Sequence, residues 1–380
     1  MKIALAFESE KWCPGDPVIL RGIHNLLPKL KQNHELHYFG VDSNHFETGT
    51  GETGDVLPGP VQLEQAKRCD YLIKMGTPAW LGKLDTELYK QWIANNKQMS
   101  LIGVGGSCGF MGKHDEQETI KTLCKYLNDG YINLWTVRSQ TTYNFIIMCG
   151  ADPDKVHIVP CPGYFFLSPC EPVKDKKVVA LDILDPHHNA LVKPQNQFPY
   201  DYCCTFYKYA EKIKYIYDSL TQSGVNVKLC CHLHLCTDQH YASPVPNYTW
   251  IRENDKRTAN FKNLVREFFP DKEIYWFRYQ EQFENFYKNI DVYIGGRLHG
   301  ALPCAGIGKP TFGLGIDNRQ WAWEQVPYIS RLDIRYGHWT PTVVTDWFHS
   351  LNAKNVSESM LAYRNKAETK YKKLLELVPV

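Results

Sequence analysis

The sequence has 380 residues with 43% hydrophobic and 22% charged side chains, a balance that excludes a disordered or fibrous protein. The formal net charge is only +2, and Lys and Arg are spread along the chain without a basic block, which argues against nucleic acid as a partner. The length is sufficient for two domains that each bury a core.

Short apolar runs alternate with amphipathic stretches through the first half of the chain. Strands are expected at Ile3–Phe7, Leu36–Gly40, Tyr71–Met75, Leu101–Val104, Leu134–Val137 and Val156–Val159. Helices are expected between them at Pro17–Lys29, Leu84–Asn95, Gln117–Leu127 and Thr141–Met148. This alternation is typical of a parallel sheet with helices on both faces.

A Pro- and charge-containing stretch at 160–177 separates this series from a second one. Strands are expected at Val178–Ile183, Val225–Leu233, Glu273–Phe277, Asp291–Ile294 and Thr311–Leu314. Helices are expected at Tyr202–Thr221, Arg257–Phe268, Gln280–Asn289 and Leu298–Gly306, and a long closing helix at Ser357–Leu377. We therefore predict an α/β protein of two Rossmann-like, doubly wound domains, 1–165 and 166–345, that face each other across a cleft, followed by a helical segment at 346–380.

The compartment is predicted from the apolar runs and the cysteines. The run before Glu8 is too short for the core of a signal peptide, and no later stretch approaches the length of a membrane span. The 13 cysteines are odd in number and include adjacent residues that cannot readily pair with each other. A cytoplasmic protein with reduced thiols is expected.

The segment 291–315 predicts a buried strand, a tight turn, a helix and a second buried strand. Gly295 and Gly296 allow a close backbone approach in the turn. A helix that starts near Leu298 directs free N–H groups toward this turn, and Arg297 adds a planar fork suited to a carboxylate or phosphate. His299 adds a donor, acid or base at the same place. An Arg in this position also commonly forms a structural ion pair, and the local chemistry leaves both interpretations open.

Two glycine-containing loops follow other predicted strands. Their candidate cleft residues are Gly15 and Asp16 in the first loop and Gly105, Gly106 and Ser107 in the second. Asp16 is also explained as the N-cap of a helix that begins with Pro17, which needs no catalytic role. The second loop lacks the G-x-G-x-x-G spacing of a dinucleotide site, so it is expected only to line the cleft.

Further cations stand at the ends of other predicted strands. Arg138 follows the strand that ends at Val137, and it is either an exposed residue or a second cation that opposes Arg297 across the cleft. Asp317 and Arg319 follow the strand after the 298–306 helix. Trp321 lies beside them and could stack on a sugar.

Cysteines and histidines at 230–236 raise the question of a metal site. Their spacing matches no standard zinc pattern, and no second ligand pair stands nearby, so we predict no metal. His232 and His234 share one face of the strand predicted there. We expect them to contact a substrate at the strand end instead.

These motifs together resemble the polysaccharide pyruvyl transferase family. The corresponding positions are Gly15-Asp16, Val137-Arg138-Ser139, Arg297-Leu298-His299 and Arg319. The resemblance covers most of the chain in order and spacing, and RLHGALPCAGIGKPTFGLG is its most specific part. Arg319 departs from the Lys found in many relatives but keeps the positive charge.

The resemblance implies a fold similar to GT-B glycosyltransferases and a pyruvyltransferase that acts in polysaccharide biosynthesis. Phosphoenolpyruvate is the implied donor, two hydroxyls of a sugar are the acceptor, and a pyruvate ketal and phosphate are the products, with no cofactor. In this hypothesis Arg138, Arg297 and Arg319 bind the anionic donor, together with Leu298 of the turn. His299 contacts the phosphate or transfers a proton, and Asp16 or Asp317 is the base for the hydroxyl.

Two other functions are consistent with the same sequence. A GT-B glycosyltransferase that uses a nucleotide sugar would share the two-domain cleft, although only Asp317 and Glu324 stand where an acidic ribose ligand is expected. A non-catalytic glycan-binding protein would explain the aromatic content of 13%. The acceptor sugar and the oligomeric state are not determined by these motifs.

Overall fold

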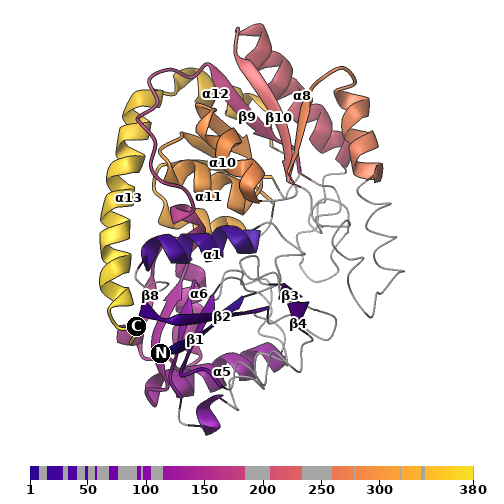
Figure 1. Cartoon of the computed structure of the whole chain (residues 1–380). Coiled ribbons are helices and arrows are strands. Elements are labelled where there is room, and N and C mark those ends of the chain that lie inside the picture. Colours follow the sequence, from indigo (N-terminus) through magenta and orange to yellow (C-terminus); the bar gives the residue numbers. More distant parts are fainter. Residues whose placement is uncertain are drawn as a thin grey trace.

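A computed structural model of the chain describes residues 1–7, 15–28, 33–40, 48–49, 56–57, 68–75, 92–95, 97–103, 114–184, 206–232, 259–277, 280–316, 318–334 and 339–379. These residues form two halves that each contain a six-stranded sheet. The N-terminal sheet lies in the lower part of Figure 1 and the C-terminal sheet in the upper part, with α1 (Gly15–Leu26) between them.

The N-terminal sheet is entirely parallel and has the order β2-β1-β5-β6-β7-β8. Its strands are β1 (Lys2–Phe7), β2 (Glu35–Gly40), β5 (Tyr71–Met75), β6 (Met99–Ile102), β7 (Ile132–Val137) and β8 (Val156–Ile158). The remaining elements of this half include α5 (His114–Asn128), α6 (Gln140–Met148), the 3₁₀ turn η2 (Pro153–Lys155) and a small antiparallel pair, β3 (Thr48–Gly49) and β4 (Val56–Leu57).

The C-terminal sheet is also parallel, with the order β11-β10-β9-β12-β13-β14. Its strands are β9 (Val178–Asp182), β10 (Asn226–His232), β11 (Ile274–Phe277), β12 (Val292–Gly295), β13 (Thr311–Gly315) and β14 (Ile329–Asp333). Around it lie α8 (Phe206–Gln222), helical residues 259–268, α10 (Gln280–Lys288), α11 (Leu298–Gly306), the 3₁₀ helix η5 (Asn318–Gln325) and α12 (Thr342–Ser350).

The strand order of the C-terminal sheet shows where the direction in which successive strands are added reverses. In the C-terminal sheet, β10 and β11 lie on one side of β9, whereas β12, β13 and β14 lie on the other. This is the order 3-2-1-4-5-6 of a doubly wound sheet, and its switch point falls between β9 and β12. Ligands of such sheets bind outside the carboxyl ends of the strands at this point.

Three groups of buried apolar residues form the core. One group lies around α8 in the C-terminal half, and another lies under α5 and α6 in the N-terminal half. The largest group includes residues of both halves, such as Leu5 of β1, Val18 of α1, Ala301 of α11 and Met360. Apolar contacts therefore join the two sheets through the helices that lie between them.

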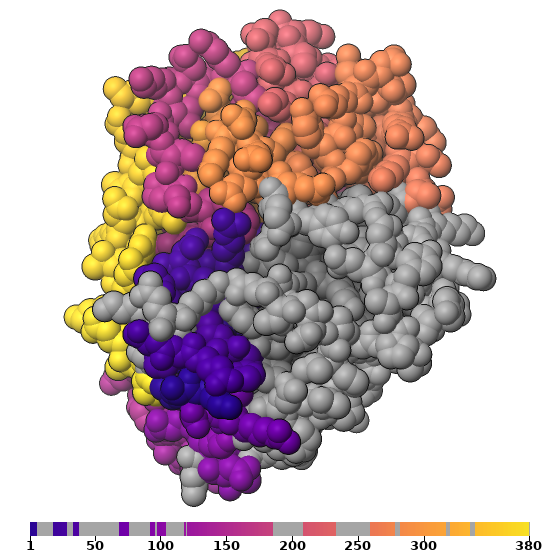
Figure 2. Space-filling view, viewed as in Figure 1, coloured from indigo at the N-terminus to yellow at the C-terminus, as the bar shows by residue number. Residues whose placement is uncertain are grey.

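The helix α13 (Ala353–Leu375) runs along one side of the molecule and touches both halves, as the yellow ribbon of Figure 1 and the yellow surface of Figure 2 show. Tyr371 Oη lies 3.3 Å from Oγ1 of Thr136 in β7, and Lys370 Nζ donates to the carbonyl of Ile158 at 3.2 Å. The predicted fold class of two doubly wound α/β halves and a closing helix is confirmed.

Candidate anion site between the two halves

Arg138 lies at the carboxyl end of β7 and is completely buried, with a relative exposure of 0%. The chain turns into α6 directly after it. Ser139 has an extended backbone and caps this helix, because its Oγ accepts the N–H of Thr142 at 3.2 Å. Strand and helix cap together direct a buried cation to the edge of the N-terminal sheet.

The guanidinium of Arg138 has few acceptors. Its Nη1 is 3.7 Å from Sγ of Cys161, a weak acceptor. Its Nε and Nη2 are buried and have no hydrogen-bond partner among the residues that the structure describes. A buried cation is costly unless acceptors or an anion compensate it. An anion bound beside Arg138 would supply both the charge and the missing acceptors.

Cys161 connects Arg138 to the C-terminal half. Its Sγ lies 3.9 Å from Nε2 of His299 in the first turn of α11. Cys161 precedes the 3₁₀ turn η3 (Pro162–Phe165), in which Gly163 sits so close to His299 that a Cβ would lie 3.3 Å from the ring Cδ2. The predicted site residues Arg138 and His299, which are 161 positions apart, therefore meet on either side of one thiol.

The turn η3 is held between two helices by glycines. A Cβ on Gly22 of α1 would lie 2.0 Å from the carbonyl oxygen of Pro162. A Cβ on Gly306 of α11 would lie 1.9 Å from the carbonyl oxygen of Tyr164. Neither distance permits a side chain, so these glycines allow the contact that places Cys161 beside His299.

The turn that precedes α11 carries the second cation. Arg297 is the N-cap residue of α11, with an extended backbone at φ −79° and ψ 123°. Its side chain is 8% exposed, and Nη2 donates to the carbonyl of His232 at 3.2 Å. The first N–H groups of α11 therefore face the carboxyl edge of the sheet, which gives this place a positive dipole end in addition to the guanidinium.

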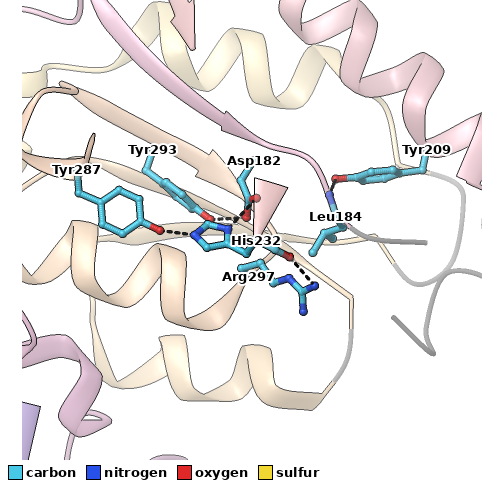
Figure 3. A network of polar contacts seen from close by, with 7 residues as sticks. All are labelled: Asp182, Leu184, Tyr209, His232, Tyr287, Tyr293 and Arg297. Atoms are coloured by element: carbon cyan, nitrogen blue, oxygen red, sulfur yellow. Dashed lines mark hydrogen bonds and ion pairs between the residues drawn. The ribbon is translucent and has the colours of Figure 1, made fainter. Parts of the chain in front are cut away.

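A hydrogen-bonded network lies beneath this turn (Figure 3). Asp182, at the end of β9, receives the O–H of Tyr293 at 2.6 Å and lies 2.9 Å from Nδ1 of His232. The Nε2 of His232 lies 2.5 Å from the hydroxyl of Tyr287. Both ring nitrogens of His232 thus contact protein groups, and the predicted contact of this residue with a substrate stays a prediction.

The other predicted residues are described to different extents. The helix α1 begins with Gly15 and Asp16, whose side chains lie outside the described residues, as does the side chain of Arg319 in η5. Leu298 is 7% exposed and packs in the core, and Trp321 is half-buried in η5. Four further predictions, Gly105, Gly106, Ser107 and His234, lie outside the described residues, and so does Asp317. Their roles stay predictions.

Sequence reasoning missed Cys161 and Asp182. The available signal for Asp182 was a carboxylate at the end of an apolar strand, immediately before the predicted strand end at Ile183. Cys161 stood in a Pro-rich connection and carried no recognisable signal. In the described part of the chain, no group of three or more His, Cys, Asp or Glu side chains is arranged to bind a metal ion. No helix there combines the length and apolar character needed to cross a membrane.

Fold and site together define a two-domain α/β protein with a GT-B-like architecture. Within that class, the model of the family "Polysaccharide pyruvyl transferase" matches residues 69–318. The chain therefore belongs to the polysaccharide pyruvyl transferase family, and it is a transferase. No curated protein sequence matches the chain significantly.

Solved structures with the same fold are distant in sequence. The UDP-GlcNAc 2-epimerase of Neisseria meningitidis bound to UDP-GlcNAc is 9% identical, with a TM-score of 0.56 and coverage of 100% of this chain and 99% of that one. MnaA of S. aureus with UDP is 11% identical, with a TM-score of 0.54 and coverage of 100% and 98%. HepE of Anabaena with UDP and glucose is 10% identical, with a TM-score of 0.51 and coverage of 99% and 98%. These similarities concern the fold.

Proposed function

We propose that the protein transfers the pyruvyl group of phosphoenolpyruvate to two hydroxyls of a sugar and forms a pyruvate ketal with release of phosphate. The observation that carries this proposal is the buried guanidinium of Arg138, whose Nε and Nη2 have no partner among the described residues. Family membership supports pyruvyl transfer in general. The donor and the ketal chemistry are the proposed part.

The donor is inferred from its charges. Phosphoenolpyruvate carries a carboxylate and a phosphate close together on one small molecule. Arg138 approaches from the N-terminal half, and Arg297 and the first turn of α11 belong to the C-terminal half. A planar guanidinium binds either anion in a bidentate manner, and helix N–H groups bind either one as well. Two cationic groups from different halves suit a ligand with two anionic ends.

The reaction requires proton transfer as well as charge neutralisation. C3 of the enol gains a proton while an acceptor hydroxyl bonds to C2, and the C2–O bond to phosphate then breaks. A second hydroxyl bonds to C2 and closes the ketal. Of the two hydroxyl protons, one balances the proton gained by C3 and the other leaves with phosphate. His299, beside Cys161 and at the start of α11, is the group that we assign to proton transfer or to the departing phosphate.

Incubation with phosphoenolpyruvate and a panel of hexose and N-acetylhexosamine glycosides tests the proposal. Phosphate release and the product mass are measured together, and we expect phosphate and a pyruvylated sugar in equal amounts. Thermal unfolding in the presence of phosphoenolpyruvate, UDP-sugars or GDP-sugars gives an independent readout, because a ligand of the folded state raises its apparent stability. A shift with nucleotide sugars alone would favour a nucleotide-sugar transferase instead.

The histidine is tested by His299→Gln, which keeps a polar side chain but removes the proton-transfer group. Loss of general acid–base catalysis lowers turnover by about 10²-fold to 10⁴-fold. His349→Gln is the matched control, because His349 is exposed at the end of α12 and remote from α11. Unchanged turnover of the His299 variant would contradict its role.

A further inference from the structure

The network under the Arg297 turn occupies the switch point of the C-terminal sheet. In the strand register, Asp182 of β9 lies opposite Cys230 of β10 on one side and Gly295 of β12 on the other. Three adjacent strands therefore end within one or two residues of this carboxylate. A doubly wound sheet binds its ligand beside this place, so a group that is buried here lies directly under the expected ligand site.

The carboxylate of Asp182 is ionised in this network. Complete burial favours the neutral form and raises the pKa, but the opposing effects of His232, the Tyr293 hydroxyl and Arg297 prevail and lower the pKa below its ordinary value. An ionised carboxylate only accepts hydrogen bonds, so Nδ1 of His232 is the donor in their contact. Burial raises the pKa of Tyr287 and Tyr293 well above normal, so both phenols stay protonated.

Arg297 is connected to this carboxylate in two ways. Its charge is among the influences that favour the ionised form of Asp182. Its Nη2 also binds the backbone carbonyl of His232, the residue whose ring is held by Asp182 and Tyr287. In Figure 3 the His232 ring lies between these two partners, and its carbonyl meets the guanidinium.

Glycines on either side of the turn, Gly295 at the end of β12 and Gly300 in α11, make room for this network. A Cβ on Gly295 would lie 2.5 Å from Cβ of Asp182, and one on Gly300 would lie 2.2 Å from the Tyr293 hydroxyl. The Gly300 position would also place a Cβ 3.1 Å from Cε1 of His232. The turn and the network are therefore packed against each other at closest approach, and a change in one displaces the other.

We propose that Asp182 and His232 are positioning residues that fix the guanidinium of Arg297 for the anionic donor. Asp182 and Tyr287 hold the ring of His232, and the backbone of that residue holds Arg297. This role rests on the proposed function, in which Arg297 binds phosphoenolpyruvate. It predicts a specific defect, because a displaced Arg297 weakens binding of the donor while the proposed proton-transfer group, His299, is unchanged.

A double-mutant cycle between Asp182→Asn and Arg297→Lys separates positioning from general stability. Asp182→Asn keeps the shape of the side chain but removes its charge, and Arg297→Lys keeps the charge but removes the fork. We expect Asp182→Asn to raise KM for phosphoenolpyruvate about tenfold or more and to lower kcat by less than about threefold. In the Arg297→Lys background the same change should raise KM by less than about twofold, because the group that it positions is already gone.

Tyr293→Phe provides a milder test if Asp182→Asn fails to fold. It removes one hydrogen bond to Asp182, so KM for phosphoenolpyruvate should rise about threefold in the unaltered background and remain unchanged in the Arg297→Lys background. Tyr71→Phe is the matched control, since Tyr71 is a buried tyrosine of the other half whose hydroxyl meets Ser100 at 2.6 Å. It should leave KM unchanged.

The outcomes distinguish the two proposals. Multiplicative effects of the substitutions on KM, or an unchanged KM in Asp182→Asn and Tyr293→Phe, would overturn the positioning role while the pyruvyl transfer stands. Absence of phosphate release by the unaltered protein on every glycoside, with no thermal shift by phosphoenolpyruvate, would overturn the proposed function and the positioning role with it.

Discussion

Two buried arginines lie beside the turn η3 and differ in the acceptors that they meet. Arg364 of α13 is 3% exposed, and its Nη1 donates to the carbonyls of Gly306 at 2.7 Å and Tyr164 at 3.2 Å. Its guanidinium also lies 5.5 Å from the ring centroid of Phe165. Arg138 reaches Cys161, the residue before the same turn, and meets only this thiol among the described residues.

The difference separates a structural arginine from the one that we propose binds the anionic donor. Arg364 satisfies carbonyls of η3 and α11 and so joins the C-terminal helix to both. Arg138 satisfies no strong acceptor among the residues that the structure describes, although it is even more deeply buried. Burial alone therefore does not distinguish the two roles, whereas the inventory of acceptors around each guanidinium does.

The largest effect is expected from Arg138→Met. Loss of one preorganised donor to a developing anion lowers turnover by about 10²-fold to 10³-fold, and KM for phosphoenolpyruvate should rise as well. The free energy of unfolding should stay unchanged or increase by about 1 kcal/mol, because an uncompensated buried charge is replaced by an apolar side chain. Steady-state kinetics and urea denaturation measure both quantities, and a clear loss of stability would make Arg138 a structural residue.

Arg364→Met should reverse this pattern. The substitution leaves two carbonyl oxygens of η3 and α11 without their donor, at a cost of about 1–3 kcal/mol in the free energy of unfolding. Turnover of the remaining folded protein should fall only a few-fold. Denaturation curves at several phosphoenolpyruvate concentrations measure the free energy of unfolding. A variant that is stable but inactive would contradict the proposed difference between the two arginines.

Tyr371→Phe is expected to have a smaller effect on stability. Its hydroxyl and Thr136 Oγ1 are 3.3 Å apart, and Thr136 Oγ1 also accepts the N–H of Gly103 at 2.8 Å. Removing one buried hydrogen bond costs about 1 kcal/mol. The denaturation midpoint should decrease while KM stays the same. A changed KM would show that this contact reaches Arg138, two residues further along the chain.

The smallest effect is expected at Cys161. A hydroxyl is a better acceptor for Arg138 than a thiol, so Cys161→Ser gives the guanidinium a competing partner and should raise KM for phosphoenolpyruvate about threefold. Cys161→Ala removes the contact with Arg138, and KM for phosphoenolpyruvate should stay unchanged or decrease. Equal effects of the two variants would mean that Cys161 acts through packing alone.

Strand ends could be predicted well from the sequence because parallel strands are apolar runs with clear termini. The placement of Arg138 after β7 and of Arg297 before α11 followed directly, as did the bounds Leu298–Gly306 of α11. The strand β14 was not predicted. It lies at the edge of its sheet and carries Arg331 and Asp333, so it lacks the apolar pattern of a central strand.

The contacts within the site were not predictable in the same way. Cys161 acquires its position because Gly22 and Gly306, on two different helices, admit η3 between them. Likewise, the contact of His232 with Asp182, 50 residues earlier in the chain, has no signal in the sequence around either residue. Such pairings depend on tertiary packing, which one sequence does not encode in any local pattern.

The contacts of α13 with both halves have a consequence for biosynthesis. This helix follows all the strands of both sheets in the chain, so both sheets leave the ribosome before the element that fastens them together. Until Arg364 and Tyr371 have been synthesised, the Tyr164 carbonyl of η3 lacks its Arg364 donor, and Thr136 of β7 lacks its contact with the Tyr371 hydroxyl. We therefore expect a nascent chain that ends before α13 to lack these contacts between the halves, and the proposed anion site to be complete only when synthesis has passed this helix.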